Sequence, residues 1–152
     1  MRPDLVFVLA DGLSSSAVTL HAIPLMERTI ARLENWHVGP VVVATQARVA
    51  IGDQIGELLH AGLVAVLIGE RPGLSSPASL GVYLTYRPAV GRNDAERNCI
   101  SNVRPEGLGH DAAAFKLVHL LEAARRRALT GVGLKDNSVW QAEAPSVVDD
   151  AR

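Results

Sequence analysis

Three segments of the chain are apolar without alternation, as in strands that are buried on both faces of a parallel sheet. They are residues 5–10, 41–44 and 63–68. Apolar positions at helical spacing separate them, over residues 15–33 and 51–60. This strand–helix order predicts right-handed crossovers with helices on both faces. We therefore predict an α/β protein with a Rossmann-like or flavodoxin-like three-layer fold and a mostly parallel sheet.

Two long stretches break this regularity. Residues 69–77 are too rich in glycine and proline for regular structure, and residues 87–109 are expected to be irregular as well. A strand is predicted between them, over residues 80–86. Long ordered loops in small domains usually carry binding function, so ligand-binding residues are expected in these two.

The last predicted element is a helix over residues 111–128, which has an acidic residue near its start and three arginines near its end. Gly131 is expected to stop it. The chain beyond has no periodicity. We predict one domain over residues 1–136 and an irregular C-terminal tail over residues 137–152.

Composition narrows the class of partner. The chain has 152 residues, a formal net charge of −1 and only 4% aromatic residues, which argues against a nucleic-acid partner. Its single cysteine, Cys99, cannot form an internal disulfide, so a reducing cytoplasm is expected. The apolar runs are far shorter than the roughly 20 residues that cross a bilayer, so no membrane partner is expected.

The candidate ligand-binding residues are those that follow the predicted strands, because ligands of open α/β sheets bind at the carboxyl ends of the strands. Asp11 follows the first strand, Arg48 the second and Glu70 the third. Each also has a plain structural interpretation, as a turn or cap residue or as half of a surface ion pair. One alternative function is a free-standing flavodoxin-like module that binds a nucleotide or phosphate at the turn over residues 11–16.

Other chemistries find less support. The dinucleotide and P-loop fingerprints are absent, and the five histidines are scattered without metal-ligand spacing, so no metal site is predicted. A hydrolase or phosphotransferase built on Asp11 and a neighbouring serine would need a base or a metal cluster that the sequence does not supply.

Four sequence blocks together resemble the small subunit, or light chain, of ethanolamine ammonia-lyase. They are DLVFVLADGLSSSAV at 4–18, RVAIGDQIGELL at 48–59, LIGERPGLSSPASL at 67–80 and DAERNCISNVRPEG at 94–107. The resemblance runs from about residue 4 to residue 135. It implies one subunit of an adenosylcobalamin-dependent ammonia-lyase that converts ethanolamine to acetaldehyde and ammonia. In this family the corrin lies at the interface with a large catalytic subunit.

The resemblance also implies site residues. By motif position, the corrin-contacting residues would be Val49, Glu70 and Cys99, with Arg48, Asp11 and Asn102 as further candidates in the same loops. Catalytic residues are expected in the large subunit only, and the cofactor's own base is expected to stay on cobalt. The implied location is the cytoplasm or a bacterial microcompartment. Family members carry a further N-terminal part, so we expect a shortened form or an excised domain.

Overall fold

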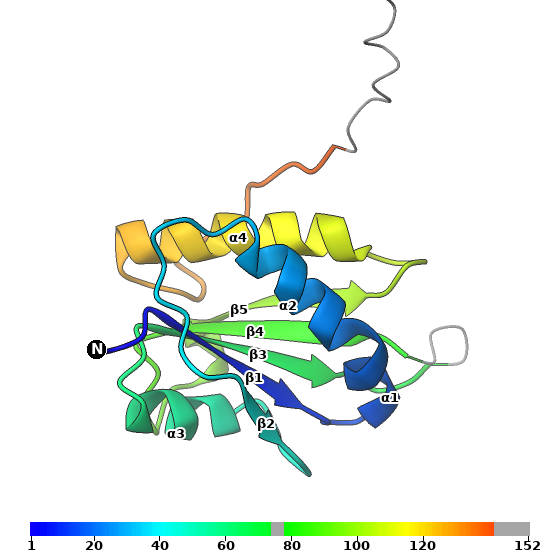
Figure 1. Cartoon of the computed structure of the whole chain (residues 1–152), viewed down its shortest axis with the longest axis horizontal. Coiled ribbons are helices and arrows are strands. Elements are labelled where there is room, and N and C mark those ends of the chain that lie inside the picture. The colour runs from blue at the N-terminus through cyan, green and yellow to red at the C-terminus, as the bar shows by residue number, and fades with distance from the viewer. Residues whose placement is uncertain (74–77, 142–152) are drawn as a thin grey trace, which may run out of the picture.

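A computed structural model of the chain describes residues 1–73 and 78–141. These residues form a five-stranded sheet with helices packed on it (Figure 1). The two most apolar strands lie at its centre, and every residue in them is buried. The strand order is β2-β1-β3-β4-β5. The strands are β1 (Leu5–Ala10), β2 (Val42–Ala44), β3 (Leu63–Gly69), β4 (Leu80–Tyr86) and β5 (Arg97–Val103).

The sheet is mixed, so the expected Rossmann-like or flavodoxin-like fold with a mostly parallel sheet is wrong. β1 pairs in parallel with β2 and β3, whereas β4 pairs antiparallel with both β3 and β5. The antiparallel pairings follow from the connections, since parallel neighbours need a crossover of a dozen or more residues, usually a helix. Residues 70–79 are too few for such a crossover, and residues 87–96 contain only a single short 3-10 turn.

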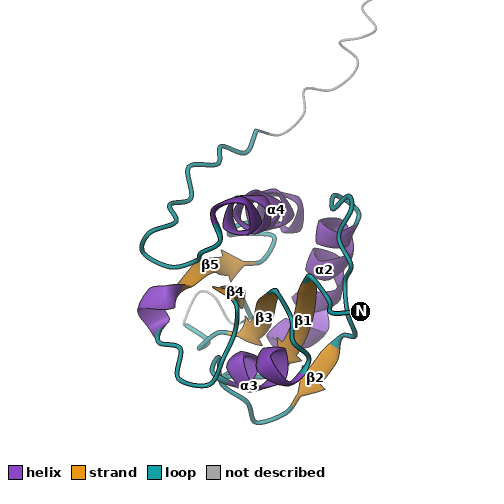
Figure 2. Cartoon of the chain, turned by 90° about the vertical axis from the view of Figure 1, so that its left-hand side faces the viewer, coloured by secondary structure: helices purple, strands orange, loops and turns teal. Residues whose placement is uncertain are grey.

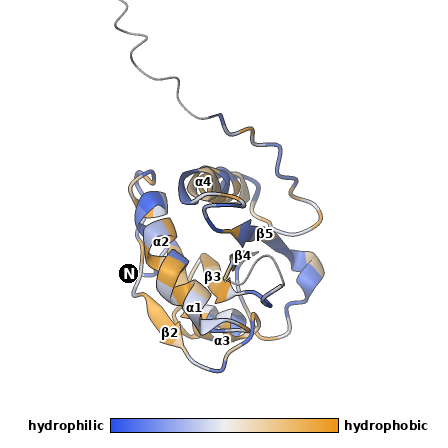
Figure 3. Cartoon of the chain, turned by 90° about the vertical axis from the view of Figure 1, so that its right-hand side faces the viewer, coloured by the Kyte–Doolittle hydropathy of each residue, from blue (hydrophilic) through white to orange (hydrophobic). Residues whose placement is uncertain are grey.

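The prediction that residues 87–109 are irregular is also wrong. They contain the 3-10 turn η2 (Asp94–Glu96) and the whole of β5. This strand lies at the edge of the sheet and is largely hydrophilic (Figure 3), and only Ile100 and Val103 are buried in it. An edge strand with few inward side chains lacks the apolar pattern by which strands are detected.

The helices cover both faces of the sheet: α2 and α4 lie on one side and α3 on the other (Figure 2). Pro24 lies in the first turn of α2, directly after the π-helical segment η1. The change of helix type there fits a residue that cannot donate a backbone hydrogen bond. No helix among the described residues is long and apolar enough to cross a membrane. The helices are α1 (Ser15–Ala17), η1 (Val18–Ala22), α2 (Ile23–Ile30), α3 (Ile51–Leu58) and α4 (His110–Arg127).

The predicted C-terminal helix is confirmed as α4. It ends at Arg127, within one residue of the predicted end, and its C-cap is Ala128, which adopts a left-handed conformation with φ of 60°; the residue that stops it is therefore Ala128 and not the expected Gly131. Residues 137–141 have no regular structure, and Trp140 packs against Phe115 with ring centroids 5.4 Å apart. The boundary between a domain over 1–136 and a tail stays a prediction. Residues 142–152 of that tail and residues 74–77 of the first loop lie outside the described residues.

Candidate functional site

The carboxyl ends of β1, β2, β3 and β5 meet at one edge of the sheet. The first three strands are parallel, and β5 runs in the same direction because two antiparallel pairings separate it from β3. We call this the carboxyl edge. Four of the six predicted site residues lie in the loops that follow β1, β2 and β3 at this edge. Asn102 is the last residue but one of β5, and Cys99 lies further inside that strand. The six are Asp11, Arg48, Val49, Glu70, Cys99 and Asn102.

Glu70 is the residue that joins three strands at this edge. It follows β3 directly, and its Oε1 accepts hydrogen bonds from Ser79 Oγ at 2.7 Å and from the Asn102 backbone N–H at 3.1 Å. These bonds link the end of β3 to the start of β4 and the end of β5. Both go to Oε1, so within the described part of the chain Oε2 remains an acceptor that can serve a ligand.

Asn102 is held by its backbone as well as by Glu70. It is left-handed, with φ of 60°, a conformation in which asparagine is enriched. Its carbonyl accepts from the Leu108 N–H at 2.9 Å, and its Oδ1 accepts from Arg104 Nε at 3.0 Å. The loop after β5 is therefore folded back on Asn102.

Asp11 fixes the loop that follows β2. Its carboxylate accepts from the backbone N–H groups of Gln46 at 2.8 Å and Ala47 at 3.1 Å. These two amides lower the pKa of Asp11 below its usual value, so the side chain stays ionised at neutral pH. Both carboxylate oxygens are engaged in positioning the residues just before Arg48. Asp11 thus contributes to the site by holding this loop in place.

Val49 and Cys99 lie on the α3 side of the sheet without a described contact between them. Val49 is half-buried against the apolar cluster beneath α3, while Arg48 is exposed. Cys99 is exposed, and its Sγ lies 3.3 Å from Ser101 Oγ. The structure thus brings Glu70 and Asn102 into direct contact and leaves Val49 and Cys99 as separate members of the site.

Tyr83 is a further candidate for this site, which the sequence did not predict. It is the cross-strand partner of Cys99 and packs against the same apolar cluster as Val49. Burial raises the pKa of Tyr83 to about 12, with neighbouring Cys99 and Glu70 adding to the effect. Its hydroxyl therefore stays protonated and uncharged at neutral pH. The period of two along β4 places Tyr83 on the face opposite to Val82 and Leu84, and its pairing with Cys99 depends on β5, which the sequence did not predict.

The turn over residues 11–16 is not prepared for a phosphate. Ser14 Oγ already accepts from the Ala17 N–H at 3.3 Å and lies 3.2 Å from Ser16 Oγ. The carboxylate of Asp11 would repel an anion at the same turn, and α1 has only three residues. The alternative of a phosphate-binding module therefore gains no support.

A pair of histidines lies on the other face, near the same edge. His21 Nδ1 and His110 Nε2 are 3.0 Å apart, and His21 Nε2 lies 3.1 Å from the Ala78 carbonyl oxygen. Because a carbonyl only accepts, His21 donates from Nε2 and accepts from His110 at Nδ1. Among the described residues, no three His, Cys, Asp or Glu side chains come together as a metal site would require.

The histidine pair predicts a loss of stability at mildly acidic pH. Burial, together with the nearby His21 and Arg28, lowers the pKa of His110 below its usual 6.5. The unfolded chain therefore binds more protons, and the free energy of unfolding falls as pH drops below about 6.5. Urea unfolding between pH 7.5 and 5 should show that fall, reduced in His110→Gln. An equal fall in His110→Gln and in His37→Gln, the control at an exposed histidine, would contradict it.

Comparison with known proteins matches the chain to one family. The family model described as ethanolamine ammonia-lyase light chain (EutC) matches residues 1–135. Proteins named ethanolamine ammonia-lyase small subunit are 56% identical over 137 residues in Azotobacter vinelandii, 58% over 141 in Rhodopseudomonas palustris and 55% over 147 in Pseudomonas aeruginosa. These alignments cover 89%, 91% and 93% of this chain and 51%, 54% and 54% of the relatives. The chain thus spans about half the length of the curated relatives it matches.

Proposed function

The chain belongs to the ethanolamine ammonia-lyase light-chain family, and we propose that it is the cofactor-holding part of an adenosylcobalamin-dependent lyase complex. In this proposal a large subunit binds ethanolamine and carries the catalytic residues. This chain covers one side of the corrin at the interface between the two subunits. The complex would act in the cytoplasm or in a bacterial microcompartment.

The observation that supports the proposal is the combination of apolar surface and a hydrogen-bond acceptor at and beside the carboxyl edge. A corrin is a broad apolar plane fringed by amide side chains, so it needs apolar contacts beside hydrogen-bonding groups. Val49 and Tyr83 supply half-buried apolar surface on the α3 side. Glu70 Oε2 would accept from a corrin amide N–H. The residues present therefore fit the cofactor.

The remaining residues would hold this edge in shape. When bound, adenosylcobalamin would supply the radical chemistry of the deamination. Asp11 fixes the approach to Arg48 through two backbone amides, and Asn102 fixes the end of β5 through Glu70. The exposed Ser101 hydroxyl and Cys99 thiol would meet the corrin fringe. We assign no proton transfer to this chain.

The proposal predicts weaker corrin binding in two variants. Val49→Asp places a charge against an apolar plane, and Glu70→Ala removes both a corrin acceptor and the bridge between β3 and β5. Each should raise the dissociation constant for adenosylcobalamin about tenfold or more, which corresponds to about 1.4 kcal/mol. The measurement is a titration of the complex with the large subunit, followed by corrin absorbance.

Two matched variants serve as controls. Val43→Asp adds the same charge at a strongly exposed valine of β2, and Glu106→Ala removes an exposed acid near the carboxyl edge. Both should bind adenosylcobalamin within twofold of wild type. Equal affinity of all four variants, in complexes that form normally, would rule out this edge as the corrin surface.

A further inference from the structure

We propose that Arg97 is a positioning residue, which sets the placement of the Val49 segment relative to the strand that carries Cys99. This inference rests on the proposed function. It adds a residue outside the carboxyl edge that acts on the site through a buried ion pair. The partner in that pair is Asp53 on α3.

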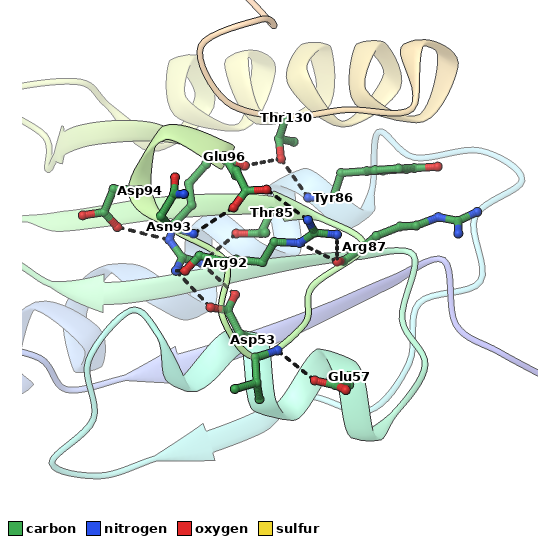
Figure 4. Close-up of polar contacts among 12 residues, drawn as sticks. Asp53, Glu57, Thr85, Tyr86, Arg87, Arg92, Asn93, Asp94, Glu96 and Thr130 are labelled. Carbon is green, nitrogen blue, oxygen red and sulfur yellow. Dashed lines mark hydrogen bonds and ion pairs between the residues drawn. The ribbon is translucent and has the colours of Figure 1, made fainter.

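The Arg97 guanidinium uses every one of its donors, and its partners Asp53, Thr85, Arg92 and Asp94 are labelled in Figure 4. Its fork meets the Asp53 carboxylate in two bonds, from Nη1 at 2.7 Å and from Nη2 at 2.9 Å. The three other bonds go to Thr85 Oγ1 at 3.2 Å, the Arg92 carbonyl at 3.1 Å and Asp94 Oδ1 at 3.2 Å. The side chains of Arg97 and Asp53 are only 5% and 4% exposed. Arginine has five N–H groups in a fixed fork, so this geometry admits one arrangement of α3, β4 and β5.

The two partners belong to the two halves of the proposed site. Asp53 lies in the first turn of α3, four residues after Val49, which lies two residues before the helix begins. Arg97 begins β5, and Cys99 follows two residues later on the same face of the strand. A shift of α3 relative to β5 would therefore move the Val49 segment away from Cys99.

Apolar packing holds α3 on the sheet but provides no directional contact to β5. Ile51 and Ile55 of α3 pack against the apolar cluster formed by β1 and β3. Gly52 lies against Val66 of β3, and Gly56 lies against Pro88 in the loop after β4. Glu57 of α3 is bonded to the Val90 N–H, in the loop after β4. Within the described chain, the side-chain hydrogen bonds that join α3 to β5 are those between Asp53 and Arg97.

The test separates positioning from stability. Arg97→Lys keeps the charge but replaces the planar fork by a point charge that cannot bond both Asp53 oxygens in the same geometry. In the complex with the large subunit, its dissociation constant for adenosylcobalamin should rise at least tenfold. Leu117→Ala, in the core beneath α4 on the other face, should stay within twofold of wild type although it lowers stability. Circular dichroism confirms that each variant is folded under the conditions of the titration.

Rescue gives a second measurement. In Arg97→Lys the side chain is shorter, and Asp53→Glu adds a methylene that restores the contact between the two charges. The double variant Asp53→Glu, Arg97→Lys should therefore bind adenosylcobalamin more tightly than Arg97→Lys alone. Binding of Arg97→Lys within twofold of wild type, or equal loss in Arg97→Lys and Leu117→Ala, would overturn the positioning role. Failure of the wild-type complex to bind adenosylcobalamin would instead overturn the proposed function, and this inference with it.

Discussion

Replacing Gly69 with alanine is expected to lower the free energy of unfolding by more than about 3 kcal/mol, or to prevent folding. Gly69 ends β3, where its backbone lies against the turn that follows β1. An added Cβ would overlap the carbonyl oxygen of Ser14 and lie 2.6 Å from that of Asp11. Both obstacles are backbone atoms, which cannot rotate away. Urea unfolding monitored by circular dichroism measures the effect.

A second alanine variant provides the control for Gly69. In Gly133→Ala the new Cβ would lie 3.4 Å from Leu129 Cδ1, an ordinary contact with a flexible side chain. Its unfolding free energy should stay within about 0.5 kcal/mol of wild type. If Gly69→Ala were as stable as Gly133→Ala, the close packing of the turns after β1 and β3 would be refuted.

Removing the carboxylate of Asp53 is expected to cost about 3–5 kcal/mol, because Asp53→Ala leaves the Arg97 guanidinium buried without its main partner. Removing the exposed partner of Arg97 should lower the free energy of unfolding far less. Asp94 also bonds Arg97, but its side chain is 96% exposed, so Asp94→Ala should cost less than about 0.5 kcal/mol. Thermal or urea unfolding of the two variants compares these losses.

A double replacement distinguishes an uncompensated charge from lost packing. Asp53→Leu combined with Arg97→Met removes both charges and keeps apolar volume, and buried ion pairs replaced in this way often lose little stability. The double variant should therefore be more stable than Asp53→Ala. A double variant that is the less stable of the two would show that the ion pair contributes more than the avoidance of a lone buried charge.

The sequence allowed prediction of the elements that are buried on both sides, and it misled where the chain is half-exposed. The apolar runs at 5–10 and 63–68 and the helix near the C-terminus were found because burial leaves a pattern. β5 was missed because it presents polar side chains on one face of an edge. The wrong sheet type came from extending the first two crossovers to the whole chain. The connection over residues 70–79 is too short for a parallel crossover and already favoured an antiparallel β4.

The candidate site, too, could be predicted only in part. The carboxyl edge was expected from strand order, and the family motifs supplied Val49, Glu70 and Cys99. Local sequence does not show that Asp11 is occupied by two backbone amides, because they belong to a loop 35 residues further along. Tyr83 and the buried pair of Asp53 and Arg97 were missed for the same reason, since each depends on a pairing between distant segments.

Amide hydrogen exchange of the complex with the large subunit, measured with and without adenosylcobalamin, shows where the cofactor binds this chain. If the carboxyl edge holds the corrin, the cofactor slows exchange in the segments around Val49, Glu70 and Cys99. The opposite end of the sheet, over residues 86–92, should exchange at an unchanged rate. Slowed exchange confined to residues 86–92, or no change anywhere in this chain on saturation of the cofactor, would contradict the assignment of the carboxyl edge as the corrin surface.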